Sequence, residues 1–297
     1  MQRGRRPDRA WAPRRAVLGG CVAALCLAVF AGFGGIVARA ADESLPAAEV
    51  IIEKSIEASG GREAIGKLTS RKSTGRMELP AMGLKVSAVE YSVVPQRSYM
   101  RMDSPEIGQI VSGSDGTIFW ETSQMTGPRL REGDEMEFSK RTGFTEELRW
   151  RDHYPQAETT GIDTVDGRPC YTVVVTPKQG QPETRYYDVE TYMLLRQDLK
   201  MASPMGEIPV EFYFTDYREV DGLIMSMQSR QVLMGGAQEM LFVTDSVWFN
   251  VEIPDSLFEV PEQIQALVAK KALNLEQKPG TEEQAAPPDA ETKAPGE

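Results

Sequence analysis

Residues 210–227, VEFYFTDYREVDGLIMSM, carry the strongest fold signal in the chain. Apolar side chains occupy every second position from Val210 to Phe214, and the alternation returns from Leu223 to Met227. A period of two places one face of a strand against a core and the other face in water. Between the two runs stands Asp221-Gly222, and Asp-Gly is a strong two-residue hairpin signal. The stretch therefore predicts two antiparallel strands joined by a tight turn.

The same pattern recurs on both sides of this hairpin. Asp115-Gly116 and Asp166-Gly167 repeat the turn signal. Extended structure is predicted to begin at Thr69, and the further extended runs are 84–94, 98–103, 117–122, 168–176, 183–188, 194–201 and 238–249. The chain lacks the alternation of strands and helices that a parallel sheet needs. We therefore predict a mostly β (α+β) fold of about ten or eleven antiparallel strands in a sandwich or barrel.

Helical patterns lie outside these strands. Residues 46–59 have an apolar stripe at helical spacing, and Gly60-Gly61 is a signal that ends the helix. Residues 131–154 are charged and do not alternate, which indicates one or two short helices in an insertion. Residues 262–275 are predicted to form a short helix. Residues 278–297 contain no bulky apolar side chain, so we expect a disordered acidic tail.

The N-terminus has the order of an export signal. Residues 1–15 are basic, residues 16–37 are almost continuously apolar, and Ala38-Arg39-Ala40 offers small residues where a signal peptidase reads the chain. We predict a signal peptide over residues 1–40, cut after Ala40. The alternative is an uncleaved inner-membrane anchor through residues 16–37, because roughly 20 apolar residues span a bilayer. The domain would then cover residues 41–262, and the helix and tail residues 263–297.

Two other features of this segment leave the export prediction unchanged. Arg14-Arg15 loosely resembles a twin-arginine signal, which would alter the route and keep the destination. Cys21 follows Leu18-Gly19-Gly20, as in a lipoprotein cleavage box, but it precedes most of the apolar run. A signal peptide is cut after its apolar region, so we do not expect lipidation at Cys21.

Charge and cysteine content narrow the function. Residues 1–40 contain seven Arg and one Asp, so their removal lowers the formal net charge from −11 to −17. An acidic protein is repelled by phosphate backbones, so we expect no nucleic-acid partner. Cys170 would be the only cysteine left, so the fold is not held by an internal disulfide.

Residue types that carry chemistry are scarce. His153 is the only histidine, and its charged surroundings predict a solvent-facing side chain. Cys170 lies in a predicted strand as a small buried side chain without a catalytic partner. The adjacent carboxylates Glu146 and Glu147 are interpreted as solvated. We therefore expect no enzyme activity, no metal and no cofactor, while a carboxylate pair brought together only in space stays open as a hydrolase alternative.

The methionine content is the one feature of the sequence that favours a binding function. Thirteen of the fourteen methionines follow the signal segment, and several of them alternate along predicted strands. Methionine is flexible and polarizable, so a strand face rich in it fits either an ordinary core or a site for varied apolar ligands. Periodicity does not separate these two interpretations.

Several strings resemble the exported family of outer-membrane lipoprotein-sorting proteins, which is related to LolA and LolB. The resemblance covers about residues 47–261. Its strings are typical of the family and are not catalytic signatures. The strings are IEKSIEASGG at 52–61, MELPAMG at 77–83, MTGPRL at 125–130, TPK at 176–178, PETRYYD at 182–188, MGEIPV at 205–210, DYREVDG at 216–222 and VEIPDS at 251–256.

The resemblance implies an unclosed antiparallel β-barrel wrapped around helices, with an apolar concave cavity for acyl chains. It implies a periplasmic, monomeric carrier in lipid or lipoprotein trafficking to the outer membrane, with lipoprotein or lipid acyl chains and envelope membrane proteins as partners. No functional residue of LolA aligns with a position here, so candidate cavity residues come from strand faces alone. They are Met77, Met100, Met102, Val210, Phe212, Phe214, Met225, Met227, Leu241 and Val243. The alternative function is a non-enzymatic envelope module, structural or sensory, that binds a protein partner.

Overall fold

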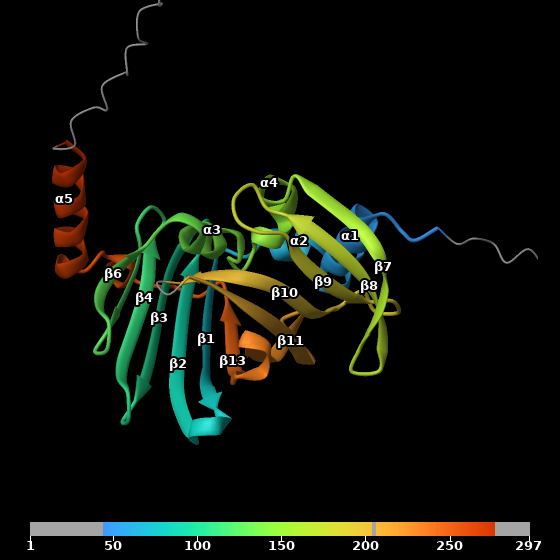
Figure 1. The fold of residues 1–297 in the computed structure, drawn as a ribbon, viewed down its shortest axis with the longest axis horizontal. Coiled ribbons are helices and arrows are strands. Elements are labelled where there is room, and N and C mark those ends of the chain that lie inside the picture. The colour runs from blue at the N-terminus through green and yellow to red at the C-terminus, as the bar shows by residue number, and fades with distance from the viewer. Residues whose placement is uncertain (1–43, 204–205, 277–297) are drawn as a thin grey trace, which may run out of the picture. The chain divides into compact units, whose positions relative to one another are not determined.

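The computed structural model describes residues 44–203 and 206–276. The predicted signal segment 1–40 and the predicted tail 278–297 lie outside these residues. Thirteen antiparallel strands form one sheet in the order β6-β5-β4-β3-β2-β1-β13-β12-β11-β10-β9-β8-β7 (Figure 1). β6 and β7 are the two separate edges of this order, so the sheet is an unclosed barrel.

The bounds of the strands follow the chain. They are β1 Ser70–Leu79, β2 Leu84–Val93, β3 Arg97–Ser104, β4 Gly108–Asp115, β5 Phe119–Ser123, β6 Gly127–Arg131, β7 Gln156–Val165, β8 Arg168–Thr176, β9 Glu183–Asp188, β10 Leu194–Ser203, β11 Gly206–Val220, β12 Leu223–Leu233 and β13 Gln238–Phe249. β1 to β6 form one antiparallel run and β7 to β13 form the other. The two runs meet in the middle of the sheet, where Arg71 of β1 pairs with Phe249 of β13.

The predicted fold class is confirmed, and the strand number is higher than the ten or eleven expected. β4, β6 and β7 are the strands that the sequence did not indicate. β4 is rich in Gly and Ser, β6 has five residues, and β7 is an edge strand with mostly polar and exposed side chains. Backbone pairing to a neighbour holds such strands, so they need no apolar alternation of their own.

Helix α1 (Ala48–Ala58) and helix α2 (Gly61–Gly66) confirm the helix predicted at the start of the domain. Ile51, Ile52 and Ile56 of α1 are buried against side chains of β8 and β9. Burial of each isoleucine contributes about 1.5–3 kcal/mol. Gly60 ends α1 with a φ of +124°, and a Cβ there would lie 2.6 Å from the Leu223 side chain. The N-terminal helix is thus fixed on the sheet at its C-terminal end.

The insertion and the C-terminal segment also form the predicted helices. α3 (Gly133–Arg141), the 3₁₀ turn η2 (Glu146–Arg149) and α4 (Trp150–His153) follow β6, and α3 packs against β10. α5 (Glu262–Glu276) lies beside the edge strand β6 (Figure 1). Shorter 3₁₀ turns are η1 (Pro80–Met82), η3 (Met234–Gly236) and η4 (Asp255–Phe258). Within residues 44–203 and 206–276, no helix has the length and apolar character needed to cross a membrane.

The buried apolar side chains of the described residues fall into three clusters. The largest joins α1 to β8 and β9, the second joins β1 to β2 around Met77 and Val86, and the third surrounds Cys170 and Leu195. No single core fills the space that the curved sheet encloses. The cavity described below lies between the sheet, α1 and the insertion.

Candidate functional site

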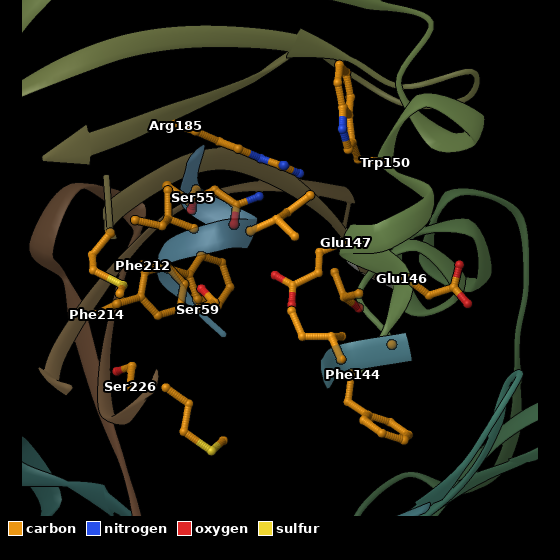
Figure 2. Close-up of a pocket in the computed structure, with 18 of the residues that line it drawn as sticks. Ser55, Ser59, Phe144, Glu146, Glu147, Trp150, Arg185, Phe212, Phe214 and Ser226 are labelled. Atoms are coloured by element: carbon orange, nitrogen blue, oxygen red, sulfur yellow. The ribbon is translucent and has the colours of Figure 1, made fainter. Parts of the chain in front are cut away.

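A cavity of about 560 Å³ lies between α1, the insertion and strands β9 to β12 (Figure 2). Its wall on the sheet side includes Phe212, Phe214 and Met225. The insertion contributes Phe144 and Trp150 from the opposite side. The lining is therefore mainly apolar, with a few serine, glutamine and charged side chains among the apolar groups.

Local sequence patterns explain both walls. On α1 and its C-cap the cavity side carries Ile52, Ser55, Ile56 and Ser59, which is the i, i+3, i+4, i+7 spacing of one helix face. On the sheet Phe212 lies opposite Gln231 and Phe214 lies opposite Ser229 in the β11–β12 pairing. The two phenylalanine rings stack with centroids 6.4 Å apart. Large rings on β11 face smaller or polar side chains on β12, which leaves space between them.

The alternation of β11 is interrupted at Asp216. This residue has a φ of +53°, and both Thr215 and Asp216 are exposed. Tyr217 therefore returns to the cavity side after two outward residues, and its hydroxyl donates a hydrogen bond to the Leu194 carbonyl at 2.5 Å. A strict period of two would have placed Tyr217 in water.

The ten candidate residues do not share one site. Phe212, Phe214 and Met225 line the 560 Å³ cavity. Met100 lines a neighbouring cavity of about 280 Å³ beneath α3. The two cavities share Arg71, Phe138 and the residues 142–144, so α3 and the loop after it lie between them.

The other candidates lie in packed regions or on the opposite face. Met77 and Met102 pack in the β1–β2 cluster. Val210 and Met227 are buried, with 2% and 4% of their surface exposed. The strand register shows on which face of the sheet Leu241 and Val243 lie. Gln231 faces the cavity, and it pairs with Met240, so Met240 lies on the same face. Leu241 and Val243 are offset from Met240 by odd numbers of residues, so they lie on the face that points away from Phe212.

A buried ionic cluster, here called the Glu183 cluster, holds the insertion to the sheet. It consists of Glu183, Arg141, Arg185, Tyr154 and Gln197. The Glu183 carboxylate accepts hydrogen bonds from Arg141 Nε at 3.0 Å, Tyr154 OH at 3.0 Å, Gln197 Nε2 at 2.8 Å and Arg185 Nη2 at 3.3 Å. The side chain of Glu183 is only 1% exposed and that of Arg141 only 7%. Burial, together with the charge of Glu183, raises the pKa of Tyr154 to about 12.

A second contact set ties α1 to the insertion. Glu53 accepts hydrogen bonds from Arg62 at 2.8 Å, Arg151 at 2.6 Å and the Trp150 indole at 3.0 Å. The hydrogen bonds from Arg62, Trp150 and Arg151 lower the pKa of Glu53 to about 2. The helix wall and the insertion wall of the cavity are therefore joined through one carboxylate.

Three predictions about single residues can be compared with the structure. The solvent-facing position predicted for His153 is wrong, because its Nε2 lies 2.6 Å from Glu146 Oε2 and its side chain is only 16% exposed. Glu146 is buried, so the interpretation of Glu146 and Glu147 as a solvated pair is also wrong. The buried position of Cys170 is confirmed. Desolvation, followed by the charge of Asp188, raises the pKa of the Cys170 thiol to about 11.

Sequence reasoning missed the contribution of α1 and of the insertion to the cavity. The serines of α1 give no signal in the sequence, because a polar residue on a helix face is expected to meet water. Phe144, Glu147 and Trp150 lack periodicity and belong to a segment with no assigned role.

Among residues 44–203 and 206–276, no group of three or more His, Cys, Asp or Glu side chains is arranged to hold a metal ion.

The architecture is an unclosed antiparallel half-barrel around helices, with an internal cavity, and the unclosed barrel predicted from the sequence is confirmed. A DUF1329 family protein from Desulfovibrio piger is similar in structure, with a TM-score of 0.50 and 14% identity over 71% of this chain and 97% of that chain. At this identity the likeness shows a shared fold alone.

Two further solved structures are similar. A putative outer membrane lipoprotein-sorting protein domain from Vibrio parahaemolyticus has a TM-score of 0.49 and 11% identity over 70% of this chain and 97% of that chain. A LolA superfamily protein from Nitrosomonas europaea has a TM-score of 0.49 and 10% identity over 73% of this chain and 99% of that chain. No protein-family model and no curated protein matches the sequence.

Proposed function

We propose that this protein is a carrier that holds an acyl chain of a lipid or lipoprotein in the cavity between α1, the insertion and β9 to β12. The observation that carries the proposal is the open, mainly apolar space of about 560 Å³ inside the half-barrel. At about 30 Å³ for each group the size of a water molecule, this space accommodates roughly 19 such groups. That is the scale of one long acyl chain.

The energetics favour an apolar guest. Each methylene transferred from water into the cavity contributes about 0.8 kcal/mol, before the costs of immobilising the ligand. Phe212 and Phe214 supply apolar rings, and the flexible thioether of Met225 adapts to a chain of irregular shape. We propose these three residues as the ligand-contacting members of the candidate set.

Lipid extraction and native mass spectrometry of the purified protein test the proposal. We expect bound lipid, and we expect the variant Ser229→Trp to lose at least 90% of it, because the indole would occupy the space opposite Phe214. Ser55→Phe blocks the cavity from the α1 wall and guards against a folding defect in the first variant. The matched control is Thr215→Trp, which adds the same indole on the exposed face of β11. Equal lipid loading in all four proteins would contradict the proposal.

We also propose that the carrier works in the periplasm, in lipid or lipoprotein trafficking to the outer membrane. The order of basic residues, apolar run and Ala-Arg-Ala in residues 1–40 supports export. The intact mass of the protein released from the periplasm is expected to correspond to a chain that begins at Ala41. A membrane-bound chain that retains residues 16–37 would instead support the anchored form.

A further inference from the structure

Two neighbouring carboxylates of η2 point in opposite directions. Figure 2 shows Glu147 directed into the cavity, with Phe212 and Phe214 on the other side, whereas Glu146 points away from it. Glu146 is engaged by His153. Among the described residues, no hydrogen bond or ion pair reaches the carboxylate of Glu147, and its side chain retains an exposed surface. Glu147 is thus an unpaired acceptor inside a mainly apolar cavity.

The cations around Glu147 are held by other carboxylates. Arg62 of α2 donates two hydrogen bonds of 2.8 Å to Glu53 and a third, of 2.9 Å, to the Leu148 carbonyl. Arg185 belongs to the Glu183 cluster. Arg71, which stacks on the Phe144 ring of the insertion, lies 2.7 Å from a carboxylate oxygen of Glu90. Each of these three guanidinium groups is therefore already paired with a carboxylate other than that of Glu147.

The guanidinium groups of the Glu183 cluster are also poorly placed for a ligand. Arg141 Nη1 and Arg185 Nε have no hydrogen-bond partner, but both atoms are buried within the protein and do not reach the cavity surface. An anionic head group in the cavity would therefore meet the exposed Glu147 carboxylate before it met either of these donors.

The surroundings of Glu147 already disfavour its charge. Loss of water around it raises the pKa of Glu147, and the charges of Arg185 and Arg62 oppose that rise. Tyr187 and Tyr217 are the other titratable groups that interact with it. When a ligand fills the cavity, more water leaves, and an unpaired buried carboxylate becomes costly. The ligand must bring a donor to Glu147, or Glu147 must take up a proton.

We infer that Glu147 determines ligand specificity, so that the cavity takes amphiphiles with an amine or another hydrogen-bond donor beside the apolar chain and disfavours those with an anionic head there. This inference rests on the proposed carrier function. It adds to the acyl-chain site a single polar contact, which the apolar walls alone do not provide.

Competition binding with two probes of equal chain length tests the inference. Dodecylamine and dodecyl sulfonate displace a fluorescent apolar reporter from the delipidated protein, and both probes keep their charge between pH 4 and 8. At neutral pH we expect dodecylamine to bind at least tenfold more tightly than the sulfonate. Glu147→Gln should reduce this ratio to about two or less, and lowering the pH should reduce it in the native protein alone.

Glu146→Gln is the matched control, because it removes the same charge one residue away, from a side chain that points away from Phe212 and Phe214. Glu63→Gln, at an exposed site of α2, is a second control in case the loss of the His153 contact weakens the fold. Both controls should keep the native ratio. Failure of the native protein to bind either probe would overturn the carrier proposal. Binding of both probes with equal strength, tighter binding of the sulfonate, or an unchanged ratio in Glu147→Gln would overturn the role of Glu147.

Discussion

Replacement of Glu183 by Gln is expected to destabilise the protein by about 3–5 kcal/mol, the usual cost of breaking a buried ion pair. The structure sets this magnitude. The Glu183 carboxylate is 1% exposed and accepts from Arg141 and Arg185, whose side chains are themselves only 7% and 14% exposed. Glutamine keeps the shape and one acceptor oxygen, so the expected loss comes from the two unpaired buried cations rather than from a cavity.

Urea and thermal unfolding measure this effect. For a domain of this size about 1 kcal/mol shifts Tm by 2–4 °C, so we expect Tm to fall by roughly 10 °C. The matched control is Glu63→Gln, which removes a carboxylate 2.6 Å from Lys67 in a pair whose side chains are 86% and 70% exposed. An exposed pair contributes about 0–1 kcal/mol, so the control should unfold almost as the native protein does. A loss below 1 kcal/mol for Glu183→Gln would refute the argument that this cluster anchors α3 to the sheet.

Two further predictions concern pH and backbone approach. The pKa of Glu53 is lowered to about 2 in the folded protein, so its contribution to stability is complete above about pH 4.5 and is lost as the pH falls from there towards 2. The stability difference between the native protein and Glu53→Gln should therefore shrink over that interval in urea titrations, and a constant difference would contradict it. Gly75→Ala should unfold the β1–β13 pairing, because a Cβ there would lie 2.1 Å from the Val243 carbonyl oxygen. Gly161→Ala, where a Cβ meets nothing within 4 Å, should change stability by less than about 1 kcal/mol in the same unfolding assay.

Part of the cavity wall was predictable from the sequence, and the missing part has a physical explanation. Phe212 and Phe214 were found because the wall they form follows strand alternation, and Met225 was found for the same reason. Leu241 was assigned to the cavity on equal grounds, yet the β12–β13 register turns it away. Alternation shows that a strand has an apolar face and a polar face. It does not show which face of one strand lies on the same side of the sheet as a given face of the next strand, because that depends on the register between them.

The sequence by itself determined the antiparallel sheet, the N-terminal helix, the short helices of the insertion and the buried position of Cys170, because each depends on periodicity or burial within a few neighbouring residues. Only the tertiary structure decided that Glu147 faces Phe212, that Glu146 meets His153, and that the cavity stays open beneath the insertion. These contacts join segments far apart in the chain, and their geometry depends on the curvature of thirteen strands and on the break in alternation at Asp216. Patterns within a few neighbouring residues predict neither the curvature of the sheet nor the break at Asp216.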